Sequence, residues 1–479
     1  MNILLIYPPN THQAVYSRNF RRLKGSETSA YPPLGLMYLQ AMIKRETAHN
    51  VKIIDLTVPS ADRIDLAKVV RDFAPQIVGI TAYTLCFYDV LQTARLIRAI
   101  DANIKVVIGG PHVDLYPLES LGHSEIDFAV VGDGEIPFLA LMGALENSGD
   151  LSGIPSLYYR DPQGKVCVTP RLKPDRSLES LPIPCRKDLN EDDYYNPFFS
   201  EKRFATISTS RGCPFQCTFC DVADKYFRSR SISNVLDEIE ALHKDQGIGS
   251  FFIVDDLFNI TPDRCLDFCR GLKERGLKIK WIFRGRIDQV NEEVLRECFL
   301  TGCVHVIYGV EDFTDEGLKA IKKHITLEQA VRVFEMTRKQ GVKTTANFII
   351  GFPHHRTDED IRKLPELLKT LRPDYLQVGI LIPFPGSPIF KDGVNRGIID
   401  PQKWLAYVKN PMAVFEMPLW EEHLSLSSLT AHYEKIMRGF YLSPNQLFKR
   451  LREIDSWHRL VSYLKVGLAT FRMGKKYDA

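Results

Sequence analysis

The sequence predicts an α/β protein in which a doubly wound sheet is followed by a partial (β/α)6 barrel and a helical region. Short apolar runs alternate with amphipathic stretches of helical length over the first 145 residues, and again from residue 204 to about 400. Strands that alternate with helices in this way form parallel sheets covered by helices. At 479 residues the chain is also too long for one ordinary core, so we expect several domains.

The first series of elements predicts a five-stranded domain. Apolar runs at 2–7, 51–56, 77–81, 105–110 and 127–132 are the expected strands. The helical stretches between them lie near 34–45, 64–74, 86–100 and 135–147. Turn glycines follow two of the strands, at Gly109-Gly110 and Gly132-Asp133-Gly134. Because open parallel sheets bind ligands beyond the carboxyl ends of their strands, we expect a Rossmann-like or flavodoxin-like domain with a site at that edge.

The second series predicts six further strand–helix units. Its strands are expected at 204–209, 250–256, 278–286, 305–311, 343–353 and 375–384. Six units are too few for a closed eight-stranded barrel, so a partial, open barrel is expected. A small hairpin turning at Pro162-Gln163-Gly164 and a Pro- and Ser-rich linker separate the two series. The expected domains are therefore 1–148, the hairpin and linker 149–203, the barrel 204–400 and a helical region 401–479.

Composition and charge exclude several classes of protein. The net charge is +3, from 62 basic and 59 acidic residues, which gives no support for a nucleic-acid partner. No run approaches 18 apolar residues, and "MNILLIYPPN" resembles a first strand rather than a signal peptide. Ten scattered cysteines do not make a disulfide scaffold, so we expect a reducing, cytoplasmic location. The basic stretch 446–476 would allow peripheral membrane contact.

Three clustered cysteines carry the strongest chemical signal. Cys213, Cys217 and Cys220 in "RGCPFQCTFC" come directly after the first barrel strand, where barrel enzymes keep their chemistry. Inert buried thiols would be out of place beside Arg211-Gly212, and a zinc site would lack its fourth ligand. Ligands of a 4Fe–4S cluster would leave one iron free to bind a small chelating molecule. These three interpretations remain open on the residues alone.

The spacing C-x3-C-x2-C, with aromatic Phe219 in the last gap, resembles the signature of the radical S-adenosylmethionine (SAM) superfamily. The resemblance covers residues 204–400 and implies a 4Fe–4S cluster on the three cysteines, with SAM on the open iron. It also implies SAM contacts at successive strand ends. Their motifs are "VDD" (254–256), "RGR" (284–286), "YGVED" (308–312), "FIIGFP" (348–353) and "PFPGSPIF" (383–390). The expected SAM-binding residues are Phe219, Asp255, Arg286, Glu311, Gly351 and Pro383.

The first domain resembles the cobalamin-binding domain of one class within that superfamily. The segments that carry the likeness are "YPPLGLMYLQAMI" (31–43), "GGPHV" (109–113) and "VVGDGE" (130–135). The resemblance implies that the nucleotide tail of cobalamin binds between the sheet and its helices, with the upper face of the corrin presented to the barrel mouth. The residues expected to bind it are Thr57, Thr81, Gly109, Gly110, Gly132, Asp133 and Glu135.

One departure concerns the residue below cobalt. Many cobalamin domains carry D-x-H-x-x-G, whose His ligates the metal, whereas "DLTVPS" (55–60) keeps Asp55 but has Thr57 in place of the His. Threonine is a poor ligand for cobalt, so we expect cobalt to lack a His ligand. His112 is expected to be an ordinary turn residue.

The resemblance implies an enzyme that uses SAM, the cluster and cobalamin to abstract hydrogen from an unactivated carbon. Methyl transfer from methylcobalamin is the first expectation, and oxidative cyclisation or ring rearrangement of a lipid-like or tetrapyrrole substrate is the alternative. The expected partners are a small or lipid-like substrate and a one-electron reductant of the flavodoxin or ferredoxin type. A tRNA methylthiotransferase would need a second cysteine trio, and Cys86, Cys167 and Cys185 are too widely spread to form one. A cobalamin sensor would not need the SAM contacts. No residue is assigned to the chemistry at the substrate itself.

Overall fold

The computed structural model describes residues 1–11, 13–15, 30–175, 177–201, 203–222 and 226–452. Over these residues the chain forms two compact units. The first contains Met1–Val15, Ser29–Asn196 and Pro401–Met417, and the second contains Pro197–Asp400 and the chain from Pro418 onward. No helix among the described residues is long and apolar enough to cross a lipid bilayer.

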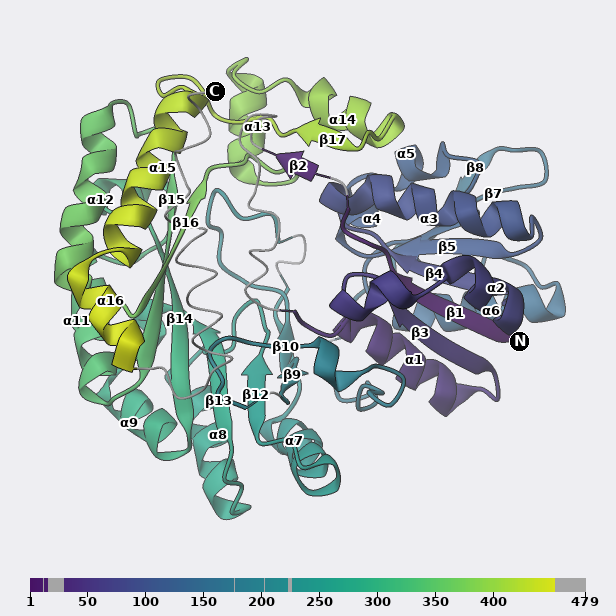
Figure 1. Cartoon of the computed structure of the whole chain (residues 1–479). Helices are drawn as coiled ribbons and strands as arrows, with labels where there is room; N and C mark the ends of the chain where they lie inside the picture. Colours follow the sequence, from purple (N-terminus) through teal and green to yellow (C-terminus); the bar gives the residue numbers. More distant parts are fainter. Residues whose placement is uncertain (12, 16–29, 176, 202, 223–225, 453–479) are drawn as a thin grey trace. The chain divides into compact units, whose positions relative to one another are not determined.

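A seven-stranded sheet in the order β3-β1-β4-β5-β6-β7-β8 forms the centre of the first unit (Figure 1). Its five parallel strands are β1 (Asn2–Tyr7), β3 (Asn50–Asp55), β4 (Ile77–Thr81), β5 (Lys105–Gly109) and β6 (Phe128–Val130). Counted along the chain, these strands have the order 2-1-3-4-5 of flavodoxin-like folds. The order reverses between β1 and β4, so the crevice that such sheets offer to a ligand opens where these two strands end.

The expected hairpin extends this sheet. Strand β7 (Leu157–Arg160) continues it antiparallel to β6, and β8 (Val166–Val168) pairs antiparallel with β7. The hairpin turns at Gly164, whose φ of +82° suits glycine and whose amide donates to the Asp161 carbonyl at 2.9 Å. A pair of short antiparallel strands thus covers the edge that the last parallel strand would otherwise expose.

Helices cover both faces of the first sheet. The main ones are α1 (Leu34–Glu46), α2 (Leu66–Phe73), α3 (Phe87–Ile100) and α6 (Glu135–Asn147), with the short helices α4 (Pro111–Leu115) and α5 (Pro117–Leu121). Helices α1 and α6 pack against each other, and α2 packs against α3. Gly79 allows a close approach in the middle of β4, because a Cβ there would lie 2.9 Å from Leu5 and 3.4 Å from Phe138.

Residues 401–417, which the sequence placed with the C-terminal helical region, pack on the first unit. Helix α14 (Pro401–Lys409) and strand β17 (Val414–Glu416) lie here, and β17 pairs in parallel with β2 (Gln13–Val15). The His123 ring contacts the Val408 carbonyl at 2.9 Å, and Tyr407 stacks on Phe415 at 4.2 Å. The short turns η1 (Pro59–Arg63), η2 (Thr84–Cys86) and η3 (Glu191–Asp193) complete the unit.

The second unit holds six parallel strands in chain order, which is the expected partial barrel. They are β9 (Ala205–Ile207), β12 (Ser250–Ile253), β13 (Lys280–Gly285), β14 (Cys303–Glu311), β15 (Lys343–Ile350) and β16 (Tyr375–Ile380). Cys265, Cys269, Cys298 and Cys303 lie buried in its core, as an ordinary packing role requires. The α/β class and the two-part architecture predicted from the sequence are therefore confirmed.

The helices that follow these strands begin at polar caps. They are α7 (Ile232–Gln246), α8 (Pro262–Glu274), α9 (Glu292–Leu300), α10 (Asp315–Ala320), α11 (Leu327–Lys339), α12 (Asp358–Leu371) and α13 (Pro388–Asn395). The side chain of the residue before each helix accepts the backbone N–H of the residue three positions later. These capping residues are Ser231, Thr261, Asn291, Thr314, Thr326, Thr357 and Ser387. Such caps satisfy amides that the first turn of a helix leaves unpaired. They also fix where each strand-end loop stops.

Two further helices, α15 (Leu426–Tyr441) and α16 (Pro444–Arg452), close the described chain. Helix α15 packs on β16 and α12. The Tyr441 hydroxyl donates to the Leu376 carbonyl at 2.8 Å and accepts the Leu376 amide at 3.0 Å. It thereby satisfies both polar groups at one position of the open sheet edge. Of the basic stretch 446–476, the residues beyond 452 lie outside the described chain.

Candidate functional site

The cysteine loop leaves the barrel at the end of β9. It runs between β10 (Ser210–Arg211) and β11 (Arg228–Ser229), which pair antiparallel and close its base. Its three cysteines stand at the carboxyl edge of the parallel strands, as the sequence predicted for a catalytic loop.

Asp255, at the end of β12, anchors the base of this loop. Its buried carboxylate accepts the Thr209 amide at 2.6 Å and the Ser210 hydroxyl at 2.7 Å. Burial raises the pKa of the Asp255 carboxyl, while these hydrogen bonds oppose the shift. The structure thus places Asp255 under the loop, and its expected contact with SAM stays a prediction. The neighbouring Asp256 is exposed and close enough to raise the pKa of Cys213.

The thiols lie in a partly buried pocket of the loop. Cys217 is buried, whereas Cys213 and Cys220 are half-buried. Burial raises the pKa of the Cys213 thiol and the nearby Cys217 raises it further, while the Arg286 guanidinium opposes the shift. Without a metal these surroundings favour the protonated thiol, and a bound metal would draw off the proton.

Backbone contacts hold the middle of the loop from two sides. Thr218 donates its amide to the Ile321 carbonyl at 3.0 Å, just after α10. Its own carbonyl accepts the Ile389 amide at 2.8 Å, in the first turn of α13. The segment between Cys217 and Phe219 is therefore fixed by the units that follow strands four and six, which sequence spacing alone did not reveal.

The arrangement of the thiols fits a cluster better than a single ion. Among the residues that the structure describes, one group of at least three His, Cys, Asp or Glu ligand atoms lies within 4.8 Å of one another, and it contains no cysteine. A single zinc ion, with Zn–S bonds of about 2.3 Å, would draw its thiolates closer together than that. The donor set of three thiols on one loop fits a 4Fe–4S cluster with an iron left open.

Arg286, after β13, is a buried cation beside the cysteine loop. Its guanidinium donates to both Asp288 carboxylate oxygens at 2.9 Å and to the Lys323 carbonyl at 2.8 Å. It also stacks 3.6 Å from the centre of the Phe215 ring. These contacts fix a planar donor whose geometry matches a carboxylate.

Glu311 ends β14 in an unusual backbone conformation. The register with β15 shifts between Gly309 and Glu311, and Glu311 has a φ of +79°, which non-glycine residues rarely adopt. Its carboxylate contacts the Lys323 ammonium at 3.2 Å, and both side chains are nearly buried. A Cβ on Gly309 would lie 2.1 Å from the Glu311 carboxylate, so a larger residue there would displace this flexible carboxylate from its place beside Lys323. The bulge turns Glu311 toward Lys323.

The ends of strands five and six also reach the cysteine loop. Gly351, with a φ of +89°, turns the chain after β15, and the next residue, Phe352, packs on Phe219 with ring centres 5.8 Å apart. Pro383 is buried in the loop after β16. This loop ends where the Ser387 hydroxyl donates to the Phe384 carbonyl at 2.7 Å and caps α13.

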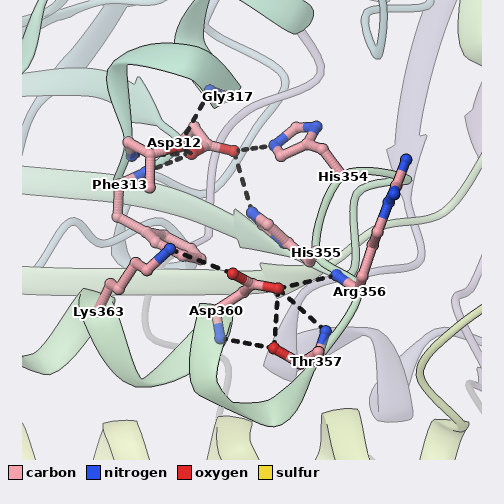
Figure 2. Close-up of polar contacts among 10 residues, drawn as sticks. Asp312, Phe313, Gly317, His354, His355, Arg356, Thr357, Asp360 and Lys363 are labelled. Atoms are coloured by element: carbon pink, nitrogen blue, oxygen red, sulfur yellow. Dashed lines mark hydrogen bonds and ion pairs between the residues drawn. The ribbon is translucent and has the colours of Figure 1, made fainter.

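Sequence reasoning missed a buried polar cluster beside these motifs. Asp312, His354 and His355 converge so that both rings contact one carboxylate oxygen, at 2.7 Å from His354 and 3.1 Å from His355 (Figure 2). The signal was present as a His pair directly after "FIIGFP" and an Asp directly after Glu311. It was not recognised because the two segments are 42 residues apart in the chain.

In the first unit, Thr57 and Asp55 form a closed polar contact at the end of β3. Thr57 donates its amide and its hydroxyl to Asp55 Oδ1, at 2.9 and 2.6 Å, and the Tyr194 hydroxyl donates to Oδ2 at 2.9 Å. Burial raises the pKa of Asp55, against these hydrogen bonds. Asp55 is thus held by Thr57 itself and by a residue of the linker. The end of the neighbouring β1 carries Tyr7, whose ring contacts Tyr83 edge-on at 6.2 Å.

The ends of β4 and β5 approach each other closely beside Thr81. Ala82 donates its amide to the Gly109 carbonyl at 2.7 Å, and its own carbonyl accepts the His112 amide at 3.1 Å. Gly110 has a φ of +107°, and a Cβ there would lie 2.9 Å from the Ala82 carbonyl oxygen. His112 is fully buried, with ring contacts at 3.1 Å to the Thr84 and Ser120 hydroxyls; its polar groups are satisfied, but it lies in the short helix α4 and not in the turn that the sequence predicted.

The remaining expected cobalamin contacts follow β6. Gly132 has a φ of +76° and donates its amide to Asp114 at 3.0 Å, while Asp133 is half-buried. Glu135 is the buried first residue of α6. All seven expected residues therefore lie at the carboxyl ends of β3 to β6, and glycine turns follow β5 and β6. Their contacts with cobalamin stay predictions.

Comparisons with known proteins agree with both units. The family model described as "B12 binding domain" matches residues 25–142, and the model described as "Radical SAM superfamily" matches residues 207–368. The chain is 33% identical over 457 residues to the uncharacterized methyltransferase PH0819 of Pyrococcus horikoshii, with 95% of each chain covered. It is 29% identical to the anaerobic magnesium-protoporphyrin IX monomethyl ester cyclase of Rubrivivax gelatinosus, over 84% of this chain and 72% of that protein.

A solved structure shares the fold. The radical SAM methyltransferase TsrM of Kitasatospora setae, with tryptophan and a SAM analogue bound, superposes with a TM-score of 0.67 at 20% identity. The similarity covers 82% of this chain and 76% of that one.

Proposed function

Because this chain belongs to the cobalamin-binding radical SAM superfamily, we propose that it is a methyltransferase that acts on an unactivated carbon of a small or lipid-like molecule. The membership confirms three expectations from the sequence: the superfamily, a radical SAM enzyme, and the cofactors 4Fe–4S cluster, SAM and cobalamin. The substrate, the transferred group and the role of each site residue belong to the proposal.

The observation that carries the proposal is the set of groups at the barrel edge. When bound, the cluster and SAM supply a 5′-deoxyadenosyl radical that removes a hydrogen atom, and methylcobalamin supplies a methyl group. Three thiols would hold the cluster, and the buried Arg286 guanidinium beside them would bind the SAM carboxylate in place of the Asp288 carboxylate. Glu311 would receive the SAM ammonium in place of Lys323. Opposite charges for the two ends of an amino acid thus lie at neighbouring strand ends.

The rest of the barrel edge would hold the less polar part of SAM. Gly351 begins the loop after β15 and Pro383 lies in the loop after β16, while Phe219 packs on Phe352 next to Gly351. An aromatic and glycine surface of this kind suits a nucleoside, because flat rings stack and bare backbone allows close approach. The external reductant would be a one-electron donor of the flavodoxin or ferredoxin type.

Methyl transfer is tested by following a label. The protein is reconstituted anaerobically with iron, sulfide and 13C-methylcobalamin, then given SAM, a one-electron reductant and an extract of small molecules and lipids. We expect 5′-deoxyadenosine and a labelled compound other than cobalamin. No 5′-deoxyadenosine from protein with confirmed cluster content would refute the radical chemistry.

Oxidative cyclisation is the second candidate, favoured by the 29% identity to the magnesium-protoporphyrin ester cyclase. In the same experiment it predicts that 5′-deoxyadenosine forms in response to the extract while the label stays on cobalamin. That outcome would replace the methyltransferase proposal and would leave the assignment of the three cofactors unchanged.

Membrane contact is a separate proposal for the basic end of the chain. On α16, the apolar side chains of Leu447, Phe448 and Leu451 are 48 to 65% exposed beside Lys449, Arg450 and Arg452. Apolar and basic side chains together favour an anionic lipid surface. The protein should co-sediment with vesicles rich in anionic lipid, and equal recovery with neutral vesicles or none would refute this contact.

A further inference from the structure

Asp312 is a fully buried carboxylate at the junction of two SAM motifs. It follows Glu311 directly, and its Oδ1 accepts the backbone amides of Phe313 at 2.7 Å and Thr314 at 3.0 Å. Its other oxygen faces His354 and His355 from the loop after β15 (Figure 2). A Cβ on Gly317 would lie 2.2 Å from this carboxylate, so α10 also leaves room for it. Backbone amides therefore hold one oxygen of the Asp312 carboxylate, and the two histidines hold the other.

The hydrogen bonds of His355 determine its tautomer. Nδ1 accepts two backbone amides, from Gly351 at 3.1 Å and Phe352 at 3.2 Å. An amide can donate only to a nitrogen without a proton, so the proton of the neutral ring is on Nε2. Nε2–H then donates to Asp312 at 3.1 Å. Burial lowers the pKa of His355, which agrees with a neutral ring.

This tautomer argues against a metal ion bound by the three side chains, although their ligand atoms lie within 4.8 Å of one another. A metal ligand needs a free lone pair, and Nε2 carries the proton while Nδ1 is occupied by the two amides. His355 instead bridges two chain segments. One end holds the Asp312 carboxylate after strand four, and the other holds the turn after strand five.

The bridge joins the groups that the proposed function places around SAM. On one side, Asp312 is covalently next to Glu311, whose φ of +79° needs support from its surroundings. On the other, Gly351 has a φ of +89°, and Phe352 packs on Phe219 of the cysteine loop. His355 therefore contacts the turn at strand five directly, and it is connected to Glu311 through Asp312 and to Phe219 through Phe352.

We propose that His355 is a positioning residue for SAM, which holds Glu311 and the Gly351-Phe352 turn at the mutual spacing that SAM binding requires. This inference rests on the proposed function, because it concerns the same SAM site. His355 need not touch SAM: it acts through Asp312 on one side and through two backbone amides on the other.

Two substitutions cut the bridge at opposite ends. His355→Asn keeps an acceptor near the position of Nδ1 but has no donor that reaches Asp312. His355→Gln keeps a donor near the position of Nε2 but loses the acceptor for the two amides. Asp360→Asn is the control, because Asp360 accepts the backbone amides of Arg356 and Thr357 at the start of α12 and makes no hydrogen bond to His355 or Asp312 (Figure 2).

SAM affinity is measured on cluster-loaded full-length protein, together with the change that SAM causes in the electron paramagnetic resonance spectrum of the reduced cluster. We expect both His355 variants to bind SAM about tenfold more weakly, which is ~1.4 kcal/mol. The KM for SAM in 5′-deoxyadenosine formation should rise more than kcat falls, and iron and cobalamin content should be unchanged. Asp360→Asn should lower the melting temperature but leave SAM affinity within about threefold, since its cap is worth ~1 kcal/mol of helix stability.

Wild-type SAM affinity in both His355 variants would overturn the proposal. Loss of cluster iron in both, with iron retained by Asp360→Asn, would also overturn it, because His355 would then serve the fold and not SAM. A transition metal other than iron and cobalt, lost on His354→Gln, would show a metal site instead. Absence of 5′-deoxyadenosine from the wild-type protein would refute the proposed function itself, which separates the two failures.

Discussion

Replacing Gly110 by alanine tests whether the edge of the first sheet is built for a close approach of β4 and β5. Gly110 has a φ of 107° and a ψ of −179°, a region that side chains with a Cβ avoid. An added Cβ would lie 2.9 Å from the Ala82 carbonyl oxygen, which is backbone and also accepts the His112 amide. Neither the angle nor the contact can relax without moving the ends of the two strands.

The size of the effect follows from these two terms. The backbone strain costs ~1–3 kcal/mol and the forced contact adds at least ~1 kcal/mol. We therefore expect Gly110→Ala to lower the free energy of unfolding by about 3 kcal/mol, which reduces the folded-to-unfolded ratio more than a hundredfold. Cobalamin affinity should fall as well, because the strand ends that would hold it are displaced.

Two measurements test these effects. Urea unfolding of the first unit, followed by circular dichroism, measures the stability. Retention of the cobalamin absorption bands after gel filtration measures cobalamin binding. Gly143→Ala in α6 is the matched control, because a Cβ there meets nothing within 4 Å. It should leave cobalamin binding unchanged and stabilise the helix by up to ~1 kcal/mol. If Gly110→Ala were as stable as the wild type and retained cobalamin, the reasoning about this edge would be wrong.

Four further outcomes are expected. Cys217→Ala should abolish iron loading and SAM cleavage but leave the corrin absorption bands, and SAM cleavage by a reconstituted variant would contradict the assigned ligands. In the electron paramagnetic resonance spectrum of Co(II) cobalamin, the wild-type protein should show no nitrogen hyperfine coupling from the protein. The variant Thr57→His, beside Asp55, should introduce this coupling. Coupling in the wild type would disprove a cobalt without a His ligand. Hydrogen bonds and the neighbouring histidines hold the pKa of Asp312 below its usual value despite burial. The contribution of Asp312 to stability is therefore full above the unfolded pKa of about 3.9 and lost as pH falls below it. Asp312→Asn should therefore make the free energy of unfolding fall less steeply at acid pH. An unchanged acid dependence would contradict this. Tyr441→Phe should cost ~1–3 kcal/mol of stability, because it leaves two edge groups of Leu376 unpaired, and an unchanged denaturation midpoint would show that water replaces the hydroxyl.

The order of the elements was accessible from the sequence because each strand and helix records its own period of apolar residues. The strand expected at 77–81 is β4 (Ile77–Thr81), and the helix expected near 135–147 is α6 (Glu135–Asn147). The expected strand 250–256 is shorter, ending at Ile253, because Asp255 turns away to accept the Thr209 amide. Local periodicity identifies where an element lies, but hydrogen bonds from elsewhere decide where it ends.

Contacts between distant segments were not accessible in the same way. Thr218 is bound by the backbone at Ile321 and Ile389, and a backbone acceptor has no sequence signature. Nothing in the pattern of α14 or β17 marks them as partners of the first unit, since an apolar face does not specify what covers it.

The sequence by itself determined the two-part α/β architecture, and its cysteine spacing indicated the superfamily through a resemblance; that cobalt lacks a His ligand at Thr57 stays a prediction. Periodicity and motif spacing are local properties that can be read directly from the order of residues along the chain. Only the tertiary structure decided between a Rossmann-like and a flavodoxin-like order, because strand order is a matter of pairing. It alone also brought His355 to Asp312 and gave Glu311 its bulge. These features depend on directed hydrogen bonds between side chains and backbone that meet only after the barrel has formed.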